Sequence, residues 1–263
     1  MKRDQLGVLL KQWRRVRAKS QLALALDAGV SARHLSFVES GRSSPSREFL
    51  STLADALDIP LRERNQLLAA AGFAPMYRES AMSADEMCQV RDALARLLEH
   101  QEPYPAVVLD RQWNVVQTNR SAPKLFGLFV DLATLPQPSN LLRNMFNPAG
   151  MRPWIANWDV VSRTLVQRVY HEAVSGIPDE ATLRLLQELE ANPASTGPSP
   201  WVGRPLPFHP VVFSKGDLQL SFFSMITTVG APIDVTAQEL RIEAFFPADA
   251  ETDLFARRNF SSN

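Results

Sequence analysis

The stretch from Gln21 to Arg42 constrains this chain most, because it is patterned as a short helix, a turn and a second short helix. Two short helices that cross at a steep angle need a small residue where they approach each other, and Ala25 is such a residue. Gly29 can form the left-handed turn between them without steric cost, and Ser31 can cap the second helix. The pattern therefore predicts a helix-turn-helix unit whose shared core contains Leu24, Ala28, Val30, Leu35 and Val38.

Further helices are expected on both sides of this unit. Apolar residues between Leu6 and Val16 recur at helical spacing, and Ser46 ends a loop where another helix can start. A fifth helix is predicted from Leu61 to Ala71, ending at Gly72. We therefore expect residues 1–78 to form an all-α domain of five helices.

The charge of the chain is divided unevenly between its two parts. The whole chain is neutral, but residues 1–78 carry 13 Lys and Arg against 7 Asp and Glu. Residues 79–263 carry the other 15 basic residues and 21 acidic ones. A basic first part joined to an acidic second part indicates that only the first part faces a polyanion such as DNA.

Three segments carry a resemblance to a known family, and they are residues 33–42, 57–65 and 70–75. The helix-turn-helix resembles that of the Xre and phage-repressor class, and these segments resemble its MmyB-like branch. The resemblance implies a transcription regulator with a phage-repressor-like DNA-binding domain. It also implies an α+β, PAS-like ligand-binding domain with a five-stranded antiparallel sheet at the C-terminal end.

The second helix of the unit, Ala32–Ser40, is the expected recognition helix in the major groove. If Leu35 and Val38 face the core, the outward residues are Ala32, Arg33, Ser36 and Phe37. Arg33 is the best candidate for reading a base, because its guanidinium matches O6 and N7 of guanine. Ala32 or Phe37 can contact a thymine methyl group.

Gln21, at the start of the preceding helix, and Ser40 and Arg42, just past the recognition helix, are expected to hold phosphates. The resemblance implies that Arg47 approaches the minor groove and that Arg14 and Glu39 form a structural ion pair. The predicted DNA-binding set is Gln21, Ser31, Ala32, Arg33, Ser36, Phe37, Ser40, Arg42 and Arg47. The alternative for each of these residues is an ordinary solvated surface position.

Residues 79–103 are expected to form a linker helix, centred on Ala84–Glu99. The pattern leaves open whether this helix links the domains, contacts a second copy or belongs to the following domain. From residue 104 to 263 the element order is that of a PAS-like domain. The expected strands are Ala106–Leu109, Trp113–Thr118, Pro207–Phe213, Leu218–Val229 and Glu239–Phe246, and the expected helices are Ser121–Val130, Ser139–Phe146, Trp154–Ser175 and Glu180–Ala191.

The C-terminal domain is interpreted as the sensor of a small apolar or amphipathic ligand. Trp154 and Trp158 lie one helical turn apart and can present an aromatic wall. Phe222 faces inward from a strand, and Arg143 and Arg152 can hold an acidic head group. Ordinary core packing is the alternative for the aromatic residues, and a dimerisation or protein-docking module is the alternative for the domain.

No catalytic or metal-binding constellation is found in the sequence. The four histidines are isolated from one another, and Cys88 is the only cysteine. No apolar run approaches the roughly 20 residues that cross a bilayer. We therefore expect a non-enzymatic regulator without a cofactor or a metal, which binds a double-stranded DNA operator as a homodimer. We expect it in the bacterial cytoplasm, associated with the nucleoid and without a membrane partner.

Overall fold

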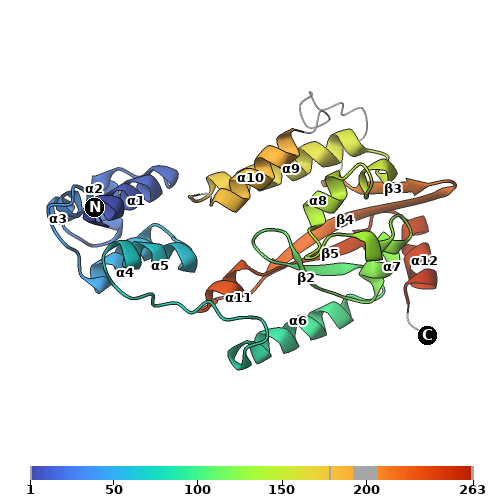
Figure 1. Ribbon diagram of the computed structural model, residues 1–263, viewed down its shortest axis with the longest axis horizontal. Helices are drawn as coiled ribbons and strands as arrows, with labels where there is room; N and C mark the ends of the chain where they lie inside the picture. The colour runs from blue at the N-terminus through green and yellow to red at the C-terminus, as the bar shows by residue number, and fades with distance from the viewer. Residues whose placement is uncertain (1, 178, 192–206, 262–263) are drawn as a thin grey trace. The chain divides into compact units, whose positions relative to one another are not determined.

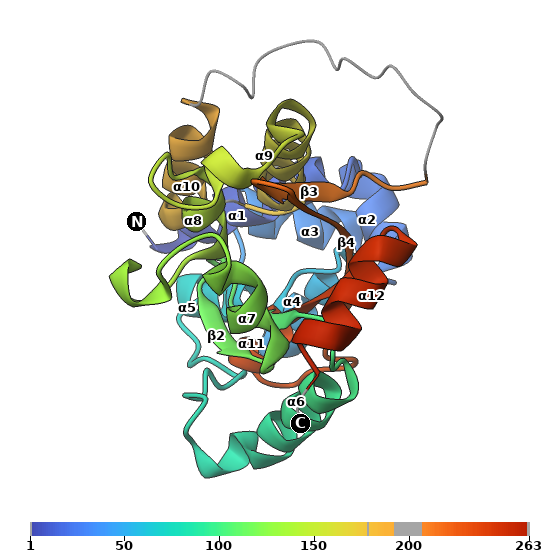
Figure 2. The same ribbon diagram turned by 90° about the vertical axis from the view of Figure 1, so that its right-hand side faces the viewer.

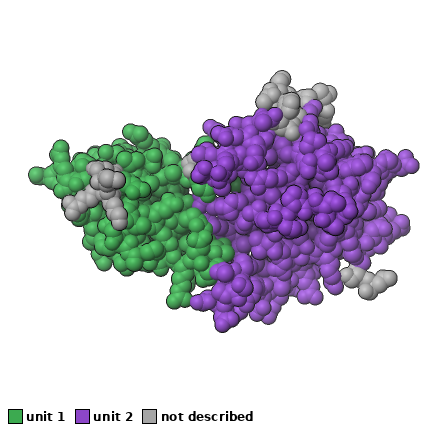
Figure 3. All heavy atoms as spheres, viewed as in Figure 1, with its two compact units in different colours: residues 1–80, 171–179, 231–238 green, residues 81–170, 180–230, 239–263 purple. Residues whose placement is uncertain are grey.

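The computed structural model describes residues 2–177, 179–191 and 207–261. The chain forms two compact units, shown in separate colours in Figure 3. The first unit contains residues 1–80, 171–179 and 231–238, and the second contains the remainder.

The first unit contains the five predicted helices (Figure 1), which are α1 (Lys2–Val16), α2 (Gln21–Asp27), α3 (Ala32–Glu39), α4 (Arg47–Ala56) and α5 (Leu61–Ala70). The phage-repressor-like all-α domain is therefore confirmed. Its core is apolar and almost fully buried, and includes Leu10, Trp13, Leu24, Leu35, Val38, Leu50, Leu53 and Leu57.

Serine caps begin three of these helices. The Oγ atoms of Ser20, Ser31 and Ser46 accept hydrogen bonds from backbone N–H groups three residues further on, at 3.1, 3.3 and 3.2 Å. Gly29 has a φ of +62°, which is the left-handed conformation expected for the turn between α2 and α3. Capping and turn chemistry thus fix the boundaries of the helix-turn-helix.

The approach of α1 to α3 depends on a residue without a side chain. A Cβ atom on Gly7 would overlap the backbone carbonyl of Glu39. Because that carbonyl belongs to the helix backbone, it cannot move aside in the way that a flexible side chain can. Gly7 therefore sets how closely α1 packs on the recognition helix.

After residue 80, five strands form one antiparallel sheet in the order β2-β1-β5-β4-β3. The strands are β1 (Ala106–Leu109), β2 (Val115–Thr118), β3 (Val211–Lys215), β4 (Leu218–Thr228) and β5 (Arg241–Pro247). The helices are η1 (Asp85–Met87), α6 (Cys88–His100), α7 (Ser121–Gly127), η2 (Leu132–Thr134), α8 (Leu141–Phe146), η3 (Arg152–Trp154), α9 (Trp158–Val174), α10 (Glu180–Glu190), α11 (Val235–Glu239) and α12 (Ala250–Asn259). The sheet and the helices confirm the α+β, PAS-like class.

Helices cover the sheet from both sides. Figures 1 and 2 both place α6 on one side of the sheet and α8 and α9 on the other, while α12 packs on β4 and β5. Leu94 and Leu98 of α6 are buried, and Asn119 after β2 donates to the carbonyl oxygen of Leu98 at 3.5 Å. The helix predicted for residues 84–99 thus packs within the second unit.

The predicted helix from Trp154 to Ser175 is wrong at its start. Trp154 ends η3, and α9 begins only at Trp158. Between them, the N–H of Ala156 donates to the carbonyl oxygen of Val212 in β3 at 2.8 Å. An amide bonded to a strand is unavailable to a helix, so the two tryptophans do not share one helical face.

Within the described residues, the α-helices α11 and α12 and the 3-10 helix η2 were absent from the prediction. Helices α11 and α12 flank β5, where the sequence predicted only the strand. Residues 192–206, which precede the strand predicted at Pro207–Phe213, lie outside the described residues.

Candidate recognition helix and ligand cavity

The exposure of α3 agrees with the predicted orientation of the recognition helix. Leu35, Val38 and Glu39 are buried, whereas Arg33 is exposed. The other predicted DNA-binding residues are exposed (Ser31, Ser40, Arg42 and Arg47) or partly buried (Gln21, Ala32, Ser36 and Phe37). The structure therefore brings the predicted set to the surface around α3, and their contacts with DNA remain a prediction.

The outward arginines are braced by aromatic rings. The guanidinium carbon of Arg33 lies 5.4 Å from the ring centroid of Phe37, one turn further along α3. Arg47 has the same separation, 5.4 Å, from the ring of Phe73. Such contacts restrict the long side chains before any DNA is bound, which lowers the entropy lost on binding.

Glu39 joins the first three helices. Its side chain is completely buried and accepts hydrogen bonds from Arg14 Nε at 2.9 Å and Arg14 Nη2 at 3.2 Å. Gln21 Nε2 donates to the same carboxylate at 2.6 Å. The expected ion pair between Arg14 and Glu39 is thus present. The Gln21 amide nitrogen, predicted to hold a phosphate, already serves this network.

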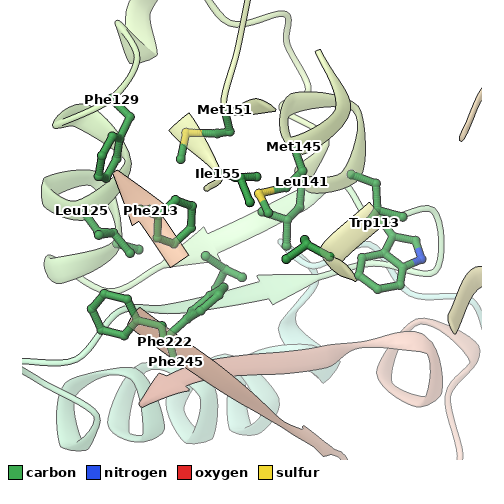
Figure 4. Close-up of a cluster of buried hydrophobic side chains, with 14 of the residues drawn as sticks. Trp113, Leu125, Phe129, Leu141, Met145, Met151, Ile155, Phe213, Phe222 and Phe245 are labelled. Atoms are coloured by element: carbon green, nitrogen blue, oxygen red, sulfur yellow. The ribbon is translucent and has the colours of Figure 1, made fainter. Parts of the chain in front are cut away.

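The second unit contains a cavity of about 100 Å³ between the sheet and α8 and α9. Its walls are mostly apolar, and several of the side chains are drawn in Figure 4. The apolar residues that line the cavity include Trp113, Leu141, Met145, Leu165, Phe222 and Phe245. A concave, largely apolar site with a few polar groups is typical of small-molecule binding.

Two polar groups of this cavity, Ser224 and Arg168, converge on Glu243 in β5. Glu243 Oε1 accepts hydrogen bonds from Ser224 Oγ at 2.7 Å and from Arg168 Nη1 at 3.2 Å. The Glu243 residue is only 5% exposed. Its second oxygen, Oε2, is buried and accepts no hydrogen bond from the described residues.

Arginines also contact the indole of Trp113. The guanidinium carbons of Arg168 and Arg241 lie 4.3 and 4.0 Å from the centroid of its ring. Trp113 is buried and has a φ of +68°, in the turn between β1 and β2. Asp110 closes this turn by accepting the N–H groups of Gln112 and Asn114 at 2.8 and 2.9 Å.

Of the five residues predicted to bind the ligand, Phe222 lines this cavity. Trp158 packs on Phe146 with the ring centroids 4.8 Å apart. The guanidinium carbon of Arg152 lies 5.7 Å from the centroid of the Trp158 ring. The ring centroids of Trp154 and Phe129 lie 6.5 Å apart in the surrounding core. Arg152, Trp154 and Trp158 therefore do not line this cavity. The two tryptophans pack against the surrounding hydrophobic core instead.

Arg143 is placed at the surface of the second unit. Its Nε lies 2.9 Å from Glu188 Oε2 of α10, and both side chains are about half exposed. The hydrogen bonds from Arg143 to Glu188 raise the pKa of the Arg143 guanidinium. A surface partner thus occupies the group that we expected to hold an acidic ligand.

Sequence reasoning missed Arg168, Ser224 and Glu243. A signal was nevertheless present, because Glu243 interrupts the apolar run of β5 between Ile242 and Ala244. A carboxylate inside an otherwise apolar strand is buried only with a partner or a function.

A second cavity, of about 270 Å³, lies beside β1, β2 and α7. Leu141 lines both cavities, so the two are neighbours. The apolar residues of the second cavity include Val107, Val115, Phe126, Val130 and Met151.

Within residues 2–177, 179–191 and 207–261, the His, Cys, Asp and Glu side chains form no group able to hold a metal ion. In the same ranges no helix is both long and apolar enough to span a bilayer.

Comparison with protein families gives two matches. Residues 5–67 match a helix-turn-helix domain family, and residues 90–258 match the MmyB-like transcription regulator ligand binding domain. No functionally curated protein matches the sequence.

Among solved structures, the chain is similar to one described as the structure of an RNA-binding Light-Oxygen-Voltage receptor. The identity is 12%, the alignment covers 91% of this chain and 60% of that one, and the TM-score is 0.30. This chain thus spans 60% of the length of that receptor chain, and the likeness is too weak to support an argument. The two family matches carry the assignment: the chain belongs to the MmyB-like transcription regulators, in which a helix-turn-helix domain for DNA binding is joined to a ligand-binding domain.

Proposed function

We propose that this protein binds a two-fold symmetric DNA operator as a homodimer. We also propose that a small apolar or amphipathic ligand in the second unit changes its affinity for that operator. The observation that carries the proposal is the exposed face of α3, where Arg33 stands outward while Leu35 and Val38 are buried. Operator binding places the protein in the bacterial cytoplasm, on the nucleoid.

The homodimer follows from the size of the recognition helix. An α-helix as short as α3 (Ala32–Glu39) reaches only a few base pairs in one major groove. Two copies that bind half-sites about 34 Å apart, one turn of the DNA, double the number of base contacts. A single copy would discriminate too weakly against the excess of non-specific sites in a genome.

Arg33→Ala and Arg42→Ala are expected to weaken DNA binding in different ways. Arg33→Ala should weaken binding to the preferred operator by about 1–3 kcal/mol and relax the preference at one base pair, because a bidentate contact to guanine is lost. Arg42→Ala should weaken binding to every sequence alike, because a phosphate contact is lost. The slope of the logarithm of the binding constant against the logarithm of the salt concentration should become shallower by about one.

The measurement begins by selecting an operator from random duplexes with the wild-type protein. Binding curves at several salt concentrations then compare the variants on the operator and on single-base substitutions of it. Arg184→Ala, which removes an exposed cation from α10, is the matched control for charge. Equal loss on all sequences for Arg33→Ala would show that Arg33 contacts only phosphate.

The composition of the cavity supports an amphipathic ligand. Apolar rings and aliphatic side chains form most of its wall, and Arg168, Ser224 and Glu243 form one hydrogen-bonded polar cluster in it. A molecule with one polar end and an apolar body matches this division. To regulate, it must bind the DNA-bound and the free conformations with different affinity.

Ligand binding is testable by native mass spectrometry of the full chain, followed by denaturing extraction. We expect a defined small molecule to accompany the wild-type protein and to be lost in Leu165→Trp, because the larger ring fills the cavity. Leu183→Trp is the control, since Leu183 is 42% exposed on α10. A wild-type protein that stays empty after exposure to cell extract would favour a domain used for dimerisation or protein docking.

A further inference from the structure

We propose that residues 231–238, which lie between β4 and β5 in the sequence, transmit the state of the ligand cavity to the first unit. In this connection Gln238 is the positioning residue, because it caps helix α5. The inference rests on the proposed function, since it names how regulation by the cavity reaches the helix-turn-helix.

The connection begins and ends at strands that line the cavity. Thr228, the last residue of β4, pairs with Arg241, the first residue of β5. Ser224 of β4 and Glu243 of β5 both line the cavity. The guanidinium carbon of Arg241 also lies 4.0 Å from the ring centroid of Trp113, which lines the same cavity. A ligand that shifts this wall therefore shifts the two ends of the connection.

Between those ends, residues 231–238 belong to the first compact unit. The N–H of Val235 donates to the carbonyl oxygen of Arg78 at 2.8 Å. In return, the N–H of Ser80 donates to Asp234 Oδ2 at 3.1 Å. Val235 is 1% exposed, so the connection is packed as well as hydrogen-bonded. It is thus an integral part of the unit that carries the recognition helix.

Gln238 completes a helix of that unit. Its Oε1 accepts the N–H of Leu61, the first residue of α5, at 2.7 Å. Pro60 occupies the N-cap position and makes no side-chain cap hydrogen bond. The first N–H groups of a helix have no partner inside the helix, and three other helices of this unit use the serine that precedes them. Helix α5 instead takes its cap from a residue 177 positions further along the chain.

Helix α5 links this cap to the recognition helix. Asn65, one turn after Leu61, accepts the N–H groups of Met76 and Tyr77 through Oδ1 at 3.0 and 3.1 Å, which ties α5 to the segment that precedes Ser80. Helix α5 packs on α1, and α1 packs on α3. Packed elements of this kind carry coupling between distant sites. A change at the first turn of α5 is therefore expected to alter the position of α3.

The first test removes the cap in the full chain. In Gln238→Ala, hydrogen exchange of peptides covering residues 60–66 should be about 2- to 30-fold faster than in the wild-type protein, the range for a lost helix cap. Gln238→Glu keeps an acceptor oxygen and places a negative charge at the helix N-terminus, so it should restore slow exchange. Gln187→Ala, at an exposed position of α10, is the control. Unchanged exchange in Gln238→Ala would overturn the role of Gln238.

The second test measures transmission by operator affinity. Leu165→Trp places an indole in the cavity and serves as the probe of a filled cavity. It should change the affinity by about fivefold or more, the lower end of typical allosteric coupling. With Gln238→Ala present, the same substitution should change the affinity by less than about twofold, and Gln238→Glu should preserve the full effect. Leu183→Trp, at a 42% exposed position, should leave the affinity unaltered in every background.

The possible outcomes separate the two proposals. An effect of Leu165→Trp that is equally large with and without Gln238→Ala would overturn the path through residues 231–238 and keep regulation by the cavity. Residues 171–179 of the first unit, which continue from the cavity-lining part of α9, would then be the next candidate. A folded Leu165→Trp variant with unchanged operator affinity would count against regulation by the cavity itself. Leu165→Phe adds less volume and replaces Leu165→Trp if hydrogen exchange shows that β4 and β5 have opened.

Discussion

Replacing Glu39 with alanine is expected to lower the free energy of unfolding of the helix-turn-helix unit by about 3–5 kcal/mol, the usual cost of breaking a buried ion pair. The carboxylate is fully buried and holds Arg14 of α1 and Gln21 of α2 against α3. Its removal leaves the guanidinium of Arg14, only 17% exposed, without its carboxylate partner. DNA binding should be lost with the fold, although Glu39 contacts no DNA in our proposal.

Hydrogen exchange followed by mass spectrometry is the suitable measurement, because it reports the opening of each unit separately. Glu48→Ala is the control, since Glu48 is an exposed acid in the same unit. The double variant Arg14→Leu, Glu39→Leu should recover much of the stability, because an apolar pair often replaces a buried ion pair without loss. A Glu39→Ala variant no less stable than Glu48→Ala would show that the network is unimportant.

The first unit was predictable because its signals are local. Ser31 and Gly29 act on residues within one turn of themselves, and their observed cap and φ angle match the expectation. The role of Gly7 was not predictable in this way. Its requirement arises from the carbonyl of Glu39, which is distant in sequence and adjacent only after α1 and α3 pack.

The second unit was predictable in its element order but less so in its boundaries. The start of α9 was placed too early because β3 captures the amide of Ala156. Periodicity cannot show such a contact, since the two segments are separated by the whole of α9 and α10.

The candidate ligand site depends even more on long-range packing. Glu243 becomes part of a cavity wall only because β5 lies between β1 and β4 and because α9 brings Arg168 over that face. Arg143 had a plausible charge, but its pairing with Glu188 of α10 was not visible in the sequence. Of the predicted aromatic residues only Phe222 lines the cavity, so the rest of the wall and the identity of the polar groups required the fold.

Trp113→Ala is expected to lower the free energy of unfolding of the second unit by about 3–5 kcal/mol, as for other large-to-small changes in a core. The indole is 1% exposed and contacts the guanidinium groups of both Arg168 and Arg241. Losing it leaves two cations beside an empty volume. The variant should also retain less of the small molecule expected with the wild-type protein in native mass spectrometry, because the indole forms one wall of the cavity.

The backbone of Trp113 provides a matched comparison. Its φ of +68° costs a residue with a Cβ atom about 1–2 kcal/mol, and glycine avoids this cost. Trp113→Gly removes the same ring but also the strain, so it should be no less stable than Trp113→Ala. Hydrogen exchange in β1 and β2 measures both variants, with Val116→Ala as the control at a 39% exposed position. If Trp113→Ala cost no more than Val116→Ala, the indole would not be the packing centre of this turn, and the arginines would hold the cavity wall through other contacts.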